Sequence, residues 1–156
     1  MAKEKKFLLS FDDEDPVEVG LVRLVKDLSP EQFFFKLNND NIFKFKRSED
    51  LKIEFFGKEY SFLQMEIPEN TFHVHFRMIA NKSFERLEKT PNSLFEHANE
   101  IVFLFENQQD VDYLLISENA SEDFSVILLP ENLVFPIQKI FIEPNEFIYQ
   151  YIQNNE

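Results

Sequence analysis

Apolar and polar residues alternate with a period of two over much of the chain, a pattern that is typical of strands with one buried face. The stretch VEVGLVRLVK, residues 17–26, shows this alternation and is rich in β-branched residues, so we predict a strand there. The segment KFLLSF, residues 6–11, precedes it after an acidic run that is typical of a turn. We therefore expect the two segments to pair as a hairpin.

One stretch, LSPEQFFFKLNND, breaks this alternation and carries the signals of a helix start. Ser29 can cap the helix, Pro30 suits the first helical position and Gln32 completes a capping box. The residues expected on its buried face are Phe33, Phe34 and Leu37. The pattern predicts a helix over 30–38.

Alternation with a period of two resumes after this helix. It predicts strands over 42–47, 51–56, 60–67 and 71–80, with a turn at 57–59. We expect these strands to form an antiparallel meander in which each strand keeps one solvated face.

The second half of the chain has a less regular pattern. Residues 81–99 lack alternation and contain a proline, which predicts a loop with a short helical turn. The segments 100–106 and 111–117 are apolar on both faces, which predicts two central strands joined by a hairpin turn. Residues 118–150 are ambiguous between helix and strand, and we expect 150–156 to be a frayed tail.

Together these elements predict an α+β fold, a single domain built on a mostly antiparallel sheet of about six to eight strands with one or two helices packed on a face. A length of 156 residues suits one domain, and no repeat or linker divides the chain. With 20 Phe and no Trp, the core should be rich in ring contacts. The residues that we expect to be mostly buried are Phe33, Phe34, Leu37, Phe72, Val74, Phe76, Val102, Leu104, Tyr113 and Leu115.

Composition excludes several classes of function. The absence of Cys excludes disulfides, thiolate catalysis and cysteine-based metal sites. A net charge of −13 disfavours nucleic acid and anionic membranes as partners. The N-terminal apolar run is too short for a signal peptide, and no window approaches the length of a membrane span, so we expect a cytoplasmic protein.

The charge is unevenly distributed along the chain. Residues 106–123 carry acids and no base, whereas FKFKRSEDLKIEFFGK, residues 43–58, is locally basic. Two interpretations stay open, namely two solvated faces of different sign and a charged docking surface.

The FHVHF segment contains the one pattern with metal-binding geometry. In a strand, His73 and His75 would lie on one face about 7 Å apart. They could hold a divalent metal if a third ligand converged, for example Glu54, Glu66 or His97. The alternative interpretation is a solvated strand face, because His-x-His is common in strands.

Asp112 and Tyr113 stand at the start of the second apolar run, where we interpret them as residues of a structural turn. An ionised carboxylate on a largely apolar face needs hydrogen-bond donors, and the backbone of 107–110 is nearest in sequence. Replacement of Asp112 by Asn should then weaken the fold. The alternative is a functional acid with a shifted pKa, for which only Glu106 and Asp110 are close in sequence.

The order of several segments carries a family resemblance: the capped helix, then KFKRSEDLKIEF, MIANKSF, NSLFEH and LFENQQDVDYLLI. Over roughly residues 5–145 the chain resembles the bacterial IPExxxDY family, small cytoplasmic proteins with no assigned activity. Asp112 and Tyr113 match the D-Y end of that signature, whereas residues 106–108 are Glu-Asn-Gln in place of Ile-Pro-Glu. The resemblance implies no catalytic residue.

These observations favour a non-catalytic protein-interaction or regulatory module whose partner is another protein or a second copy of the chain. A metal-dependent enzyme built on His73 and His75 is one alternative, and an acidic mimic that occupies a nucleic-acid-binding protein is another. The sequence predicts no catalytic residue, no cofactor and no identifiable small-molecule ligand.

Overall fold

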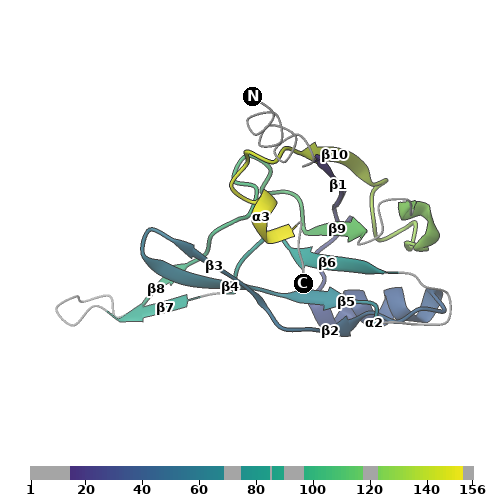
Figure 1. Ribbon diagram of the computed structural model, residues 1–156. Helices are drawn as coiled ribbons and strands as arrows, with labels where there is room; N and C mark the ends of the chain where they lie inside the picture. Colours follow the sequence, from purple (N-terminus) through teal and green to yellow (C-terminus); the bar gives the residue numbers. More distant parts are fainter. Residues whose placement is uncertain (1–14, 69–74, 85, 90–96, 118–122, 153–156) are drawn as a thin grey trace, which may run out of the picture.

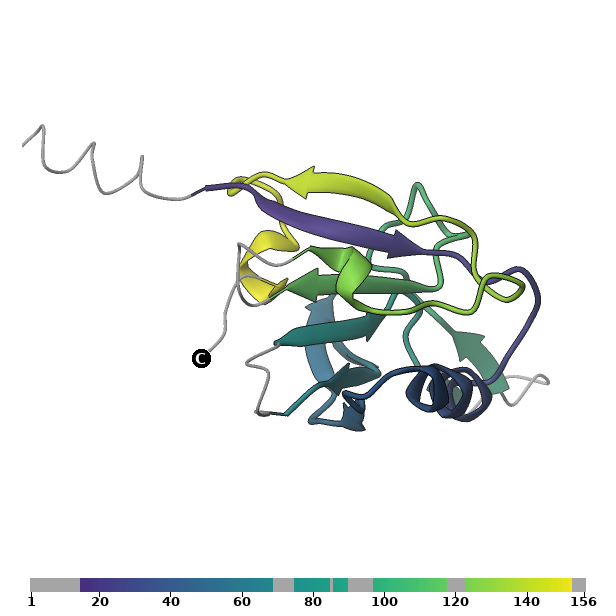
Figure 2. The same cartoon turned by 90° about the vertical axis from the view of Figure 1, so that its right-hand side faces the viewer.

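The computed structural model describes residues 15–68, 75–84, 86–89, 97–117 and 123–152. Its largest element is a six-stranded antiparallel sheet with the order β10-β1-β9-β6-β5-β2 (Figures 1 and 2). In that order the strands are Gln138–Ile142, Val17–Val22, Tyr113–Ser117, Phe76–Ala80, Gln64–Glu66 and Lys46–Arg47. Two hairpins lie outside this sheet, β3 (Leu51–Phe55) with β4 (Lys58–Phe62) and β7 (Arg86–Lys89) with β8 (His97–Glu100). With the helices α2 (Pro30–Asp40) and α3 (Tyr149–Ile152), they confirm the predicted α+β fold class.

Helix α2 begins as predicted, because both hydrogen bonds of the capping box are present. The Ser29 hydroxyl accepts a hydrogen bond from the Gln32 backbone amide at 3.2 Å, and the Gln32 side chain accepts one from the Ser29 amide at 3.0 Å. The helix ends at Asp40, two residues later than expected. Asn41 explains the difference, since its side chain donates to the Leu37 carbonyl at 2.8 Å and satisfies an end of the helix.

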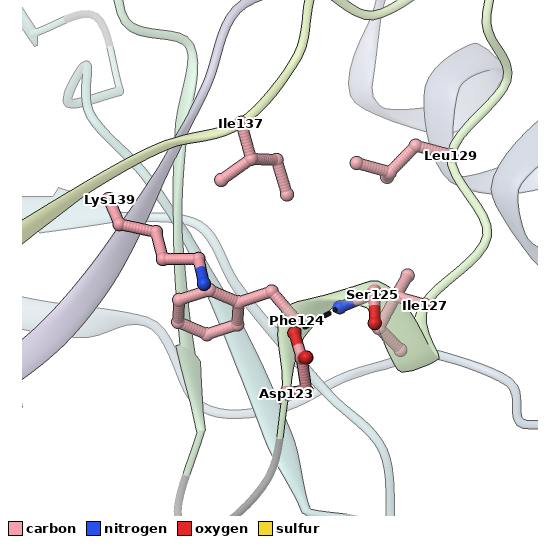
Figure 3. Close-up of a pocket in the computed structure, with 7 residues that line it drawn as sticks. All are labelled: Asp123, Phe124, Ser125, Ile127, Leu129, Ile137 and Lys139. Atoms are coloured by element: carbon pink, nitrogen blue, oxygen red, sulfur yellow. Dashed lines mark hydrogen bonds between the residues drawn. The ribbon is translucent and has the colours of Figure 1, made fainter.

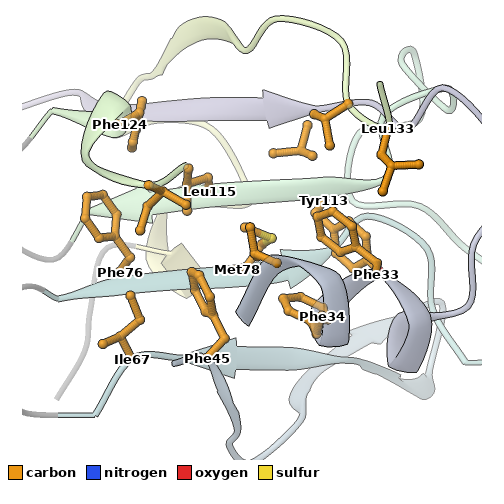
Figure 4. Close-up of a cluster of buried hydrophobic side chains, with 14 of the residues drawn as sticks. Phe33, Phe34, Phe45, Ile67, Phe76, Met78, Tyr113, Leu115, Phe124 and Leu133 are labelled. Atoms are coloured by element: carbon orange, nitrogen blue, oxygen red, sulfur yellow. The ribbon is translucent and has the colours of Figure 1, made fainter. Parts of the chain in front are cut away.

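Helix α2 covers one face of the sheet, and the packing there is aromatic (Figure 4). The Phe33 ring stacks on Tyr113 with centroids 5.1 Å apart, and Phe34 meets Tyr113 edge-on at 5.4 Å. The segment that contains the 3-10 turn Phe124–Val126 covers the rest of this face. We call this region the helix-side core; its buried residues are Val22, Phe33, Phe34, Leu37, Phe45, Leu63, Ile67, Phe76, Met78, Tyr113, Leu115, Phe124, Ile127, Leu133 and Val134.

A second core lies on the other face of the sheet, beneath the β3–β4 hairpin and α3. Leu114 and Ile116 of β9 point into it, while Tyr113 and Leu115 point to the helix side, as a strand period of two requires. Both faces of β9 are therefore buried, which confirms the prediction of a central strand. This hairpin-side core consists of Val19, Leu21, Ile53, Tyr60, Phe62, Ile79, Val111, Leu114, Ile116, Ile142, Ile148, Tyr149 and Ile152.

The predicted core is largely confirmed where the structure describes it. Six predicted residues are buried, namely Phe33, Phe34, Leu37, Phe76, Tyr113 and Leu115. Val102 and Leu104 are only partly buried against the hairpin-side core, while Phe72 and Val74 lie outside the described residues.

The predicted hairpin between 100–106 and 111–117 is wrong. Strand β9 pairs with β1 on one side and β6 on the other, so neither of its edges is available to 100–106. Within that segment Glu100 is the last residue of β8, and an isolated bridge joins Phe103 to Lys82. The polar stretch that precedes β9 therefore connects the Phe103 bridge to β9 and is not a hairpin turn.

Other predicted elements also differ. Residues 81–99 contain the β7–β8 hairpin where a loop was expected. The predicted strand 60–67 divides at Leu63, so that β4 leaves the sheet with β3 and β5 stays in it, which interrupts the meander. The predicted frayed tail is wrong as far as Ile152, which is 1% exposed in the hairpin-side core.

Several predictions fall wholly or partly outside the described residues, including the strand 6–11 and the first part of the strand 71–80. Within the described ranges, none of the helices has the length and apolar character needed to cross a membrane.

Candidate functional site

The two histidines predicted as metal ligands are not both described. His75 is partly exposed immediately before β6, whereas His73 and the side chain of His97 lie outside the described residues. Among the side chains that the structure does describe, no group of three or more His, Cys, Asp or Glu could hold a metal ion. The metal-site hypothesis therefore stays a prediction.

Asp112 lies where β9 begins, between the ends of its two neighbouring strands. Its amide donates to the Val22 carbonyl at 2.8 Å, and its carbonyl accepts from the Asn81 amide at 3.0 Å. Its carboxylate accepts a hydrogen bond from the Leu24 amide at 2.7 Å. The prediction that the backbone of 107–110 supplies the donor is thus wrong. The donor is Leu24, which follows the end of β1 and whose amide is not used in the pairing of the strands.

The pKa of the Asp112 carboxyl group decides how Asp112→Asn should affect the stability of the fold. Burial of the half-buried carboxyl group raises its pKa, and the Leu24 hydrogen bond offsets this only in part; Asp27 and Asp110 raise it further, while Lys82 lowers it. The charged form is therefore disfavoured in the folded protein. Asn in place of Asp112 keeps an oxygen for the Leu24 amide and removes the charge, so the expected weakening of the fold is not supported.

Tyr113 is a core ring, 4% exposed, in contact with α2. Burial, followed by the nearby charges of Asp112 and Glu31, raises the pKa of its phenol above the ordinary value. A phenol whose ionisation is disfavoured in this way is a poor acid or base at neutral pH.

Asn81 organises the stretch between Phe105 and Val111, a role that was not predicted from the sequence. It is fully buried, and its side chain donates to the carbonyls of Gln108 and Val111, each at 3.0 Å. Its side-chain oxygen accepts from the Phe105 amide at 2.9 Å. One amide side chain thus binds three backbone groups of the connection, which supports a structural role for this stretch.

A surface ion pair joins Arg23, just after β1, to Asp110 in the stretch before β9. Arg23 donates to Asp110 at 2.7 Å and also reaches the side chains of Gln138 and Gln108. The Arg23 hydrogen bond holds the pKa of Asp110 below its usual range. Asp110 is therefore ionised and engaged, and it is not poised to transfer a proton.

The most unusual surface residue is Phe56, at the tip of the β3–β4 hairpin. Phe55 pairs with Lys58, so Phe56 and Gly57 form a two-residue turn, with φ of 51° and 78°. Positive φ at both positions is the signature of a type I′ turn, which favours Asn-Gly. The predicted turn at 57–59 is therefore displaced, and a bulky ring occupies a left-handed position that disfavours it.

The Phe56 side chain is 95% exposed, although the hairpin that carries it is firmly held. Below the tip, Ile53 and Phe62 are buried in the hairpin-side core. Glu100 anchors the hairpin by accepting hydrogen bonds from Lys58 at 3.1 Å and from the Tyr60 hydroxyl at 2.9 Å. Figure 1 shows the β3–β4 hairpin extending beyond the six-stranded sheet. The fold thus presents an aromatic ring to solvent on a fixed support.

Comparison of the chain with protein-family models, with curated proteins and with solved structures gives no match.

Proposed function

We propose that the chain is a non-catalytic protein-interaction module, and that the β3–β4 hairpin tip is its contact surface. The observation that carries this proposal is Phe56, 95% exposed in a left-handed turn position. The partner is another protein with an apolar pocket that receives the Phe56 ring.

The physical argument compares the cost of Phe56 in the free protein with its value in a complex. A left-handed conformation costs a non-glycine residue about 1–2 kcal/mol, and a ring this exposed contributes almost no burial in return. Such outliers are concentrated at functional sites. Aromatic side chains that enter a pocket are among the residues that dominate binding energies, so the same ring would stabilise a complex.

The residues around the tip suit the rim of an interface. Glu54 and Glu59 lie directly opposite each other on β3 and β4, and both are exposed. Both carboxylates face solvent beside the tip, and basic groups of a partner would complement their charge. We therefore expect the partner pocket to be apolar at its centre and basic at its rim.

Three further predictions belong to this proposal. A cytoplasmic location is supported by the absence of Cys, which suits a reducing compartment. Membership of the bacterial IPExxxDY family rests on the order of the segments described above. The acidic-mimic alternative stays a prediction, with no described feature that favours it over an interaction at the hairpin tip.

A photo-crosslinking amino acid at position 56 tests the proposal in cells that express the full chain at its native level. The same group at Phe135, which is 49% exposed, is the control. We expect one protein to be crosslinked from position 56 and not from position 135. Equal crosslinking from both positions, or none from position 56, would overturn the proposal.

The crosslinked protein is then purified and its affinity measured with the wild-type chain, with Phe56→Asn and with Phe135→Ser. Loss of an aromatic anchor of about 2 kcal/mol weakens binding about 30-fold, and we expect Phe56→Asn to reach that value. Phe135→Ser should bind like the wild type. Unchanged affinity of Phe56→Asn would refute the role of the ring even if a partner exists.

A further inference from the structure

Gly20 marks a close approach of side chains to the sheet. It lies in the middle of β1, where glycine normally weakens a strand. A Cβ atom at this position would lie 2.9 Å from the Ile137 side chain and 3.3 Å from the Phe124 ring. The absence of a side chain at Gly20 therefore lets Ile137 and Phe124 settle onto the strand.

A surface hollow of about 310 Å³ opens beside these two side chains. Its apolar wall is formed by Phe124, Ile127, Leu129 and Ile137. Figure 3 shows Ile137 and Leu129 converging on it from opposite sides. The volume is at the lower end for small-molecule sites and suits one aliphatic or aromatic group.

Two charges of opposite sign complete the lining. Lys139 extends from β10 toward Phe124 and Asp123 (Figure 3). Asp123 accepts a hydrogen bond from the Ser125 amide at 3.0 Å. That hydrogen bond and the nearby Lys139 charge lower the pKa of Asp123, so its carboxylate is ionised at neutral pH. Within the described residues, no hydrogen bond or ion pair engages the Lys139 ammonium.

We propose that this hollow binds a free amino acid with an aliphatic or aromatic side chain. The side chain of the ligand enters the apolar part, its carboxylate meets Lys139 and its ammonium meets Asp123. A monocarboxylate would place its charge beside Asp123 without compensation, and a monoamine would do the same beside Lys139. A zwitterion matches both charges. This proposal is independent of the hairpin tip.

The test is a titration of the isotope-labelled full chain by NMR, with L-leucine and L-phenylalanine as probes. Isocaproate lacks the ammonium, isoamylamine lacks the carboxylate and L-alanine lacks the large side chain. We expect saturable shifts of the Ser125 and Lys139 amides with at least one of the two probes. Each analogue should bind at least about tenfold more weakly, because each loses one charged or apolar contact.

Two conservative variants assign the contacts. Asp123→Asn keeps an oxygen for the Ser125 amide but removes the charge for the ligand ammonium. Lys139→Met keeps the apolar stem but removes the charge for the carboxylate. Each should weaken binding about tenfold or more. Lys36→Met, on the exposed surface of α2, should leave the affinity unchanged.

Gly20→Ala tests the hollow from the side of β1, because the added methyl group displaces the Ile137 and Phe124 side chains that line the hollow. The substitution should weaken ligand binding in a variant that remains folded. The two charge variants decide the proposal if Gly20→Ala does not fold. Absence of saturable shifts with both probes would overturn it. Binding of isocaproate as tight as that of L-leucine, or unchanged affinity of Asp123→Asn, would also overturn it.

Discussion

Replacement of Asn81 by Ala should destabilise the protein strongly, because three hydrogen bonds depend on this one buried side chain. They join Asn81 to the backbone of Phe105, Gln108 and Val111 over distances of 2.9–3.0 Å. At about 1 kcal/mol each, their loss amounts to about 3 kcal/mol, and backbone groups left without partners add to it. Urea unfolding followed by circular dichroism would measure the difference in the free energy of unfolding between Asn81→Ala and the wild type. The slope of that free energy against urea concentration should be similar in the two proteins.

Two further variants sharpen this experiment. Asn81→Asp keeps the acceptor for the Phe105 amide but loses both donors and buries a charge, so it should be less stable than Asn81→Ala at neutral pH. Asn39→Ala, on the exposed surface of α2, should change stability by less than about 0.5 kcal/mol. A loss below about 1 kcal/mol for Asn81→Ala would refute the claim that Asn81 organises the connection before β9.

Three other substitutions test the packing and electrostatics. Phe33→Ala should cost about 3–5 kcal/mol in urea unfolding, because Phe33 is fully buried. Asp112→Ala should cost about 1 kcal/mol through loss of the Leu24 hydrogen bond, whereas Asp112→Asn should be close to neutral at pH 7. The pKa of Asp112 is raised in the folded state, so the contribution of Asp112 to stability falls as the pH rises from the ordinary pKa of 3.8 through the raised pKa. When the free energy of unfolding is measured against pH, Asp112→Asn should lack that fall. Tyr60→Phe should lose about 1 kcal/mol because it removes the hydrogen bond from the Tyr60 hydroxyl to Glu100, and thermal unfolding would show it.

The features that could be predicted from the sequence depend on local signals. The capping box around Ser29 needs only residues three positions apart, and it placed the start of α2 correctly. Apolar residues at consecutive positions of 113–116 correctly indicated a strand buried on both faces. Within that strand, the period of two separated the residues of the two cores without knowledge of the partners.

The features that could not be predicted depend on distant partners. The side-chain partners of Asn81 lie 24 to 30 positions away, and nothing next to Asn81 in the sequence announces them. Residues 100–106 have the composition of a strand, but both edges of β9 are occupied by other strands. Apolar and polar residues alternate along β3 and β4 in the same way whether the hairpin belongs to the six-stranded sheet or packs on it. No local signal therefore indicated that the chain leaves the hairpin for the sheet at Leu63.

The Phe56 turn lies between these cases. Gly57 indicated a turn, and pairing of Phe55 with Lys58 would have placed Phe56 in a left-handed position. The alternation pattern assigned Phe56 to the strand 51–56 instead, and Phe is an improbable residue for a type I′ turn.

The free energy of unfolding of Phe56→Asn, compared with that of the wild type by urea denaturation, shows whether Phe56 is kept for binding at a cost to the fold. Asn tolerates the left-handed position before Gly57, and the Phe56 ring, at 95% exposure, has almost no burial to lose. We therefore predict that Phe56→Asn is more stable than the wild type by about 1 kcal/mol. A variant that is less stable than the wild type would show that the Phe56 ring stabilises the fold and is not kept for binding at its expense.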